Sequence, residues 1–145
     1  MKQVQANRLI FLGILLFLLG LIIGLFVQNM ANPRMALSAH LEGIMNGMFL
    51  MLVGVIWNRI LLSEKLLKIS FWLLIYSTFA NITAVLISAL TGAGKMMPIA
   101  GGKEGAPTAE GIINFLLISL SLGVIFVCVM LLSGYYRYMK QGGDR

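Results

Sequence analysis

The sequence predicts an all-α integral membrane protein, a single-domain four-helix bundle with both its N and C termini in the cytoplasm. One observation is composition: 59% of the 145 residues are hydrophobic and 11% are charged, whereas a soluble domain carries about a quarter charged residues. The other is a set of four apolar runs, each about as long as the ~20-residue helix that crosses a bilayer. The predicted spans cover residues 9–28, 33–62, 69–90 and 111–136.

The first run, residues 9–28, is expected to remain as a helix and not to be removed as a signal peptide. It is long for the apolar part of a signal peptide, and no small-residue cleavage pattern follows it. Gly13, Gly20 and Gly24 fall on one face. Gly20 and Gly24 form a small-xxx-small pair, which lets a neighbouring helix approach closely.

The second run begins with a clear helix start. Asn32 is a favoured N-cap residue, and Pro33 suits the first helical position. A helix from Pro33 to about Leu62 places His40 about two turns from its start.

The third run, residues 69–90, is unusually polar for a membrane span and contains Tyr76 and Asn81 among several Ser and Thr residues. The segment 91–110 is a glycine-rich loop, expected to be either a functional lid or rim or disordered filler. The fourth run, residues 111–136, ends in the aromatic and basic belt that is typical of a membrane interface.

Positive charge predicts the orientation. The net charge is +6, and the side richer in Lys and Arg should be cytoplasmic. One side carries Lys2, Arg8, Arg59, Lys65, Lys68, Arg137, Lys140 and Arg145, and the other carries Arg34, Lys95 and Lys103. We therefore predict a multi-pass protein of the bacterial inner (cytoplasmic) membrane that contacts lipid. The sequence contains no cluster of basic residues interleaved with aromatics, the pattern that would indicate nucleic-acid binding. Because Cys128 is the single cysteine, an intrachain disulfide is excluded.

The second span carries the polar side chains His40, Glu42 and Asn46. Such groups are costly in hydrocarbon and are usually functional there. At about 100° per residue, Gly47 and Gly43 lie near the direction of His40, and Asn46 and Glu42 continue the arc. These glycines either admit another helix or leave a flat slot for a planar cofactor or aromatic substrate, which would make His40, Gly43 and Gly47 cofactor-binding residues.

His40 is either a structural hydrogen-bonding residue or a ligand. With one His and one Cys, a protomer cannot build a tetrahedral zinc site, whereas a haem needs only one strong protein ligand. No nucleophile elbow, P-loop, dinucleotide fingerprint or HExxH motif is present. On the third span, Tyr76 and Asn81 can each orient a small polar substrate.

The segment Ala39-His40-x5-Asn46-Gly47, at the head of the second span, resembles the hydroxylaminobenzene mutase family and the related styrene oxide isomerases. The resemblance extends over the segments 38–57, 76–81 and 90–94 and over the four-span layout. It is closer to the mutase branch.

The resemblance implies a membrane isomerase that rearranges a small aromatic substrate without net oxidation, here an arylhydroxylamine to an aminophenol. Aryl epoxide to aldehyde isomerisation is the alternative. The isomerase branch is a homotrimer with haem b near the protomer interface, which implies His40 as the iron ligand and Asn46 as a substrate-positioning residue. An acid and a tyrosine on the isomerase third helix have no secure counterparts, although Tyr76 and Asn81 lie in the corresponding span.

One mechanism suits both branches. Ferric haem on His40 would act as a Lewis acid at the substrate oxygen while the bond to that oxygen breaks. Asn46 would orient the substrate, and an apolar pocket would keep water from the resulting cation. Glu42 either moves a proton or pairs with Arg34 or His40.

Two other function classes stay open from the sequence. The chain could be a non-catalytic transport or assembly subunit in which His40 and Asn46 only join helices. It could also be a haem-based electron carrier, with a methionine as the second iron ligand.

Overall fold

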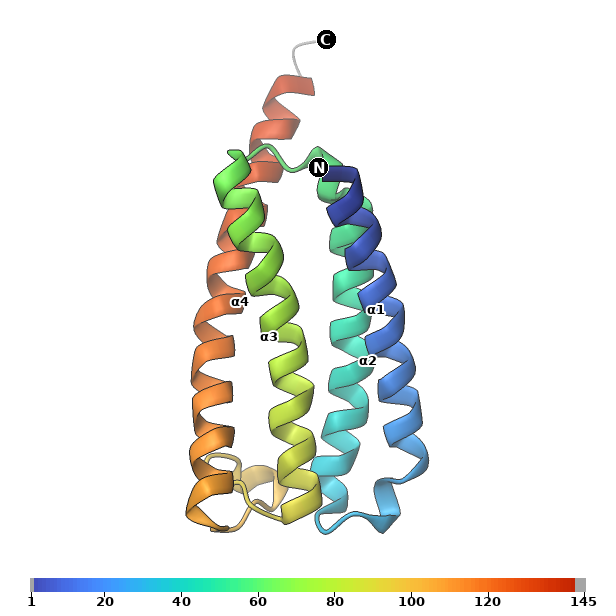
Figure 1. The fold of residues 1–145 in the computed structure, drawn as a ribbon, viewed down its shortest axis with the longest axis vertical. Helices are drawn as coiled ribbons and strands as arrows, with labels where there is room; N and C mark the ends of the chain where they lie inside the picture. Colours follow the sequence, from blue (N-terminus) through green and yellow to red (C-terminus); the bar gives the residue numbers. More distant parts are fainter. Residues whose placement is uncertain (1, 143–145) are drawn as a thin grey trace.

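The structure, a computed structural model, describes residues 2–142 and forms a bundle of four long helices (Figure 1). The long helices are α1 (Lys2–Leu25), α2 (Pro33–Ile56), α3 (Glu64–Thr91) and α4 (Pro107–Gly142). Short 3-10 helices lie in the connections: η1 (Val27–Asn29), η2 (Trp57–Arg59) and η3 (Pro98–Ala100). All four long helices are long and apolar enough to cross a membrane, and residues 2–142 form no β-strand. The predicted all-α membrane class is confirmed. Arg145 of the predicted basic side lies outside the described residues.

The chain packs as two helix pairs, α1 with α2 and α3 with α4, which meet mainly where α2 contacts α3. The start of α1 and the end of α4 lie at the same end of the bundle (Figure 1). The loop between α3 and α4 closes the opposite end. The contact between α2 and α3, which we call the seam, is therefore the main place where side chains of the two pairs meet.

Asn32 caps α2 as the sequence predicts. Its Oδ1 accepts hydrogen bonds from the backbone N–H groups of Arg34 and Met35 at 3.1 and 3.2 Å. Its own backbone N–H donates to the Ala89 carbonyl at 3.0 Å, and its Nδ2 donates to the Ala100 carbonyl at 3.2 Å. An N-cap of this kind stabilises a helix by about 1 kcal/mol. Here the same side chain also ties the start of α2 to the loop between α3 and α4, residues 92–106, which we call the outer loop because it lies at the end of the bundle away from both termini.

The predicted end of the second helix at Leu62 is wrong. Helix α2 ends at Ile56, and η2 leads into an extended residue, Ile60. Ile60 is fully buried, and the N–H of Leu61 donates to the Gly134 carbonyl of α4 at 3.1 Å. Packing against α4 therefore ends the helix, and no proline or glycine marks the position in the sequence.

Glycines bring α1 and α2 into backbone contact. A Cβ built on Gly43 would lie 2.6 Å from the Gly20 Cα, and a Cβ built on Gly47 would lie 2.7 Å from the Gly13 carbonyl oxygen. Only glycine permits so close an approach. Of the two interpretations of these glycines, the structure therefore shows helix contact. The backbone of α1 occupies the space beside Gly43 and Gly47.

The outer loop is ordered by its own backbone hydrogen bonds. Gly92 ends α3 in the left-handed region at φ 75°, and its N–H donates to the Ser88 carbonyl at 2.9 Å. The N–H of Gly94 then donates to the Lys103 carbonyl at 3.0 Å, and the N–H of Lys103 donates to the Gly92 carbonyl at 3.2 Å. The two ends of the loop are thus paired. The segment between them, including η3, lies across the end of the bundle opposite the two termini (Figure 1).

Candidate active site

The acid predicted within the membrane, Glu42, joins α2 to α3 through two amide side chains. Asn81 Nδ2 of α3 donates to Glu42 Oε2 at 2.5 Å, and Asn46 Nδ2, one turn further along α2, donates to the same oxygen at 3.4 Å. We call Glu42, Asn46 and Asn81 the carboxylate cluster. The sequence analysis considered Arg34 or His40 as the partner of Glu42. Within the described residues Glu42 pairs with neither of them and is bonded instead by the side-chain amides of Asn46 and Asn81.

A cavity of about 350 Å³ opens beside Glu42. Helix α2 contributes Glu42 and Ser38 to its wall, and α3 contributes Val85. The outer loop covers it with the segment 96–100. The walls are mostly apolar and carry few polar groups, which is the usual composition of small-molecule sites of about 300–1,000 Å³. Glu42 is the one charged side chain in this lining.

His40 lies on the side of α2 that faces α1. Its Nδ1 is 2.8 Å from the Gly20 carbonyl oxygen. Because a carbonyl only accepts hydrogen bonds, Nδ1 is the donor, and in the neutral form of the ring Nε2 then carries the lone pair. Gly24 leaves room for the ring, since a Cβ there would lie 2.5 Å from Nδ1. A histidine held through one nitrogen by a backbone carbonyl, with the other free, has the arrangement common to metal-binding histidines.

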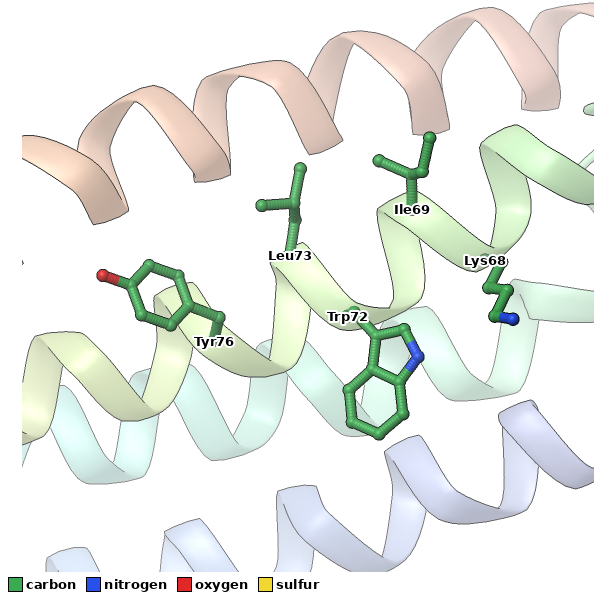
Figure 2. A pocket seen from close by; sticks show the side chains of 5 residues that line it. All are labelled: Lys68, Ile69, Trp72, Leu73 and Tyr76. Atoms are coloured by element: carbon green, nitrogen blue, oxygen red, sulfur yellow. The ribbon is translucent and has the colours of Figure 1, made fainter.

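The predicted site residues therefore fall into separate groups. Glu42, Asn46 and Asn81 come together, whereas His40 contacts α1. Tyr76 lies elsewhere, since its hydroxyl is 2.6 Å from the Ser119 Oγ of α4. Figure 2 shows Tyr76 on the α4 side of α3, along a cavity of about 440 Å³ distinct from that at Glu42.

Sequence reasoning did not single out Glu110, which organises the loop above the cavity. Its Oε1 accepts backbone N–H groups of Gly94, Lys95 and Gly105 at 3.0, 3.3 and 3.0 Å, and Oε2 accepts Lys95 at 3.3 Å. An acid in the first turn of a helix, directly after a glycine-rich loop, was the available signal, because such a loop has many free N–H groups. This carboxylate therefore holds the backbone on both sides of the segment 96–100 that lines the cavity.

The donor set limits which metal group the chain can hold. Across residues 2–142 no group of three or more His, Cys, Asp or Glu side chains lies close enough to share a metal ion. A haem, which needs one strong protein ligand, fits a single histidine whose Nε2 is free. The geometry of His40 is therefore compatible with a haem ligand.

Comparison with known proteins agrees with this picture. The family model described as styrene oxide isomerase matches residues 5–136. The chain is 50% identical over 131 residues to hydroxylaminobenzene mutase HabB of Ectopseudomonas oleovorans, covering 89% of this chain and 80% of that protein. It is 42% identical over 127 residues to hydroxylaminobenzene mutase HabA of the same organism, covering 86% of this chain and 94% of that protein. No solved structure matches the chain.

The family match covers α2 and α3 completely and most of α1 and α4, and it includes every residue of the carboxylate cluster and His40. The relatives are isomerases by name, so the predicted enzyme class is confirmed and the non-catalytic and electron-carrier alternatives are set aside. The chain belongs to the styrene oxide isomerase family.

Proposed function

We propose that this protein is a membrane mutase that rearranges an arylhydroxylamine to an aminophenol. The observation that carries the proposal is the carboxylate of Glu42, held by two amides at the wall of a mostly apolar cavity. Half of the residues in the aligned region are identical to those of a hydroxylaminobenzene mutase, which supports the choice of substrate. The aryl epoxide substrate remains the second candidate, because the matching family model is described as styrene oxide isomerase.

The reaction is an isomerisation and needs no oxidant. The N–O bond of the substrate breaks, a C–O bond forms at the ortho carbon, that carbon loses a proton and the nitrogen gains one. The two proton movements need a group that accepts and returns a proton, and a positioned carboxylate accelerates such transfers by about 10²–10⁴-fold. We assign the proton to Glu42 and the orientation of the substrate N–O group to Asn46.

Asn81 acts through Glu42. Its amide fixes the carboxylate against α2 and leaves the other oxygen, Oε1, without a hydrogen bond to either asparagine. The apolar cavity walls and the outer loop restrict bulk water, which would otherwise trap a cationic substrate.

Haem b is the cofactor that we propose, with His40 Nε2 as its ligand and the Gly20 carbonyl as the group that orients the ring. When bound, its iron supplies a Lewis acid for oxygen-bound charge. His40 and Glu42 face different sides of α2 in one protomer. We therefore propose that the active unit is a homo-oligomer, a trimer by family resemblance, in which both groups contribute to the reaction. We also propose that the protein lies in a bacterial inner membrane, with the end of the bundle that holds both termini on the cytoplasmic side.

The substrate proposal is tested by giving the detergent-purified protein phenylhydroxylamine or styrene oxide. We expect 2-aminophenol from the first at a higher kcat/KM than phenylacetaldehyde from the second. A higher kcat/KM for the epoxide would replace the arylhydroxylamine as substrate and keep the isomerase.

The cofactor proposal has a separate test. Protein expressed with added haem precursor should show a Soret band, and His40→Ala should lose or shift it while the far-ultraviolet circular dichroism stays unchanged. An identical spectrum in both proteins would remove His40 as the ligand.

A further inference from the structure

A groove away from the carboxylate cluster begins between α1 and α3, at the end of the bundle that holds both termini, and continues along the surface of α3. It consists of two adjoining hollows of about 440 and 380 Å³, which share Lys68 and Trp72. Figure 2 shows Trp72 and Lys68 extending from α3 towards α1, whereas Ile69 and Leu73 point towards α4. Arg8 of α1 completes the second hollow. We call this feature the α1–α3 groove.

The α1–α3 groove carries positive charge without an acidic partner. Among residues 2–142 the one ion pair joins Lys95 to Glu104, at the opposite end of the bundle. Glu64, one turn before Lys68 on α3, is exposed and does not approach it within ion-pair distance. Arg8 and Lys68 therefore present two cations from two helices to the same hollow.

Apolar surface adjoins these cations. Trp72 is 57% exposed and Ile69 is 37% exposed, although both lie in a helix that packs against its neighbours. Tryptophan prefers the level of the lipid headgroups, where its ring contacts hydrocarbon and its N–H contacts polar groups. A ligand that satisfies the whole groove needs an anionic head at Arg8 and Lys68 and a hydrocarbon chain along Ile69, Trp72 and Leu73.

We propose that the α1–α3 groove binds one anionic phospholipid. The phosphate contacts Arg8 and Lys68, and the upper part of an acyl chain lies against Trp72. Free phosphate would contact the two cations but would leave the apolar half of the groove unoccupied. A second copy of the chain would need acids opposite these cations, and Glu64 is the one acid that the described residues place at this end.

Trp72 provides a direct readout, because the chain holds only one other tryptophan, the fully buried Trp57. The protein is reconstituted in phosphatidylcholine vesicles that contain increasing fractions of phosphatidylglycerol or phosphatidylcholine with brominated acyl chains, which quench indole fluorescence on contact. The Trp72→Phe variant, measured in parallel, gives the contribution of Trp57, and the difference is the signal of Trp72.

We expect quenching of Trp72 to saturate at a lower mole fraction of the anionic lipid than of the zwitterionic one. Each basic residue near an anionic headgroup contributes about fivefold in affinity, so Arg8→Gln and Lys68→Gln should each reduce the preference by roughly that factor. Arg137→Gln and Lys140→Gln serve as matched controls, because these bases lie near the same end without lining the groove, and they should leave the preference unchanged. Unchanged circular dichroism verifies folding in every variant.

Three results would overturn the proposal. Equal quenching by both lipids means an ordinary lipid contact without a site. An equal loss of preference in the control variants means general attraction to an anionic surface. Protection of Trp72 from both lipids, with cross-linking between copies through a cysteine placed at Ile69, means that a second copy fills the groove.

Discussion

The hydrogen bond between Asn81 and Glu42 allows a quantitative test of the seam between the helix pairs. In Asn81→Leu the carboxylate loses its donor at 2.5 Å and keeps only the longer bond from Asn46 at 3.4 Å. Hydrogen bonds between membrane helices average about 0.6 kcal/mol, but a bond to a charged acceptor contributes about 1.5–3 kcal/mol. We expect the free energy of unfolding to fall by about 1.5–3 kcal/mol. This corresponds to a decrease of roughly 10- to 150-fold in the folding equilibrium constant.

The double variant Glu42→Leu/Asn81→Leu separates this bond from a general packing effect. Replacing both partners by apolar groups leaves no unpaired carboxylate, so it should be less destabilised than Asn81→Leu alone. The assay is unfolding of purified protein in mixed micelles by added SDS, followed by circular dichroism. If the losses of the two single variants simply add in the double variant, Glu42 and Asn81 do not interact and the cluster as described is refuted.

Three further predictions rest on other contacts. Gly43→Leu should destabilise the protein by about 1–3 kcal/mol or more in the same assay, because α1 fills the space beside Gly43. Gly111→Ala should stay near wild type, because no atom lies within 4 Å of a Cβ at that position. Equal effects of the two substitutions would refute the backbone contact. Glu110→Ala removes both oxygens that hold the loop and should speed its proteolysis several-fold. Glu104→Ala removes an exposed ion pair of the kind that contributes about 0–1 kcal/mol and should not; similar rates in both would show that Glu110 does not anchor the loop. Tyr76→Phe should retain aminophenol formation within about threefold, well below the loss expected for a general acid–base residue, because the hydroxyl bonds to α4; a larger loss would place Tyr76 at the substrate.

Much of the fold could be predicted because its signals are local. Length and apolarity define four spans, and Asn32 with the following proline predicts the start of α2. The glycine face of the first span also predicts a close helix contact. The end of α2 could not be predicted, because it depends on packing between Ile60 and Gly134, residues far apart in the sequence.

The candidate site was predictable residue by residue but not as an arrangement. Glu42, Asn46 and Asn81 are each conspicuous because polar groups are costly in a membrane. Their pairing depends on how α2 and α3 are rotated about their axes, which helical periodicity alone does not define. The same periodicity placed His40 and Glu42 along one polar arc, whereas in the bundle α1 covers one end of that arc and α3 covers the other.

The central claim is that the Glu42 carboxylate moves the proton in the rearrangement. The most direct measurement is kcat for 2-aminophenol formation from phenylhydroxylamine by Glu42→Gln beside wild type, in protein of matched helicity. The glutamine side chain keeps a carbonyl oxygen for the amides of Asn81 and Asn46, so the seam should stay closed while proton transfer is lost. We predict that kcat falls by about 100-fold or more. A kcat within about threefold of wild type would contradict the assignment of the proton to Glu42 and return the site to the chemistry around His40.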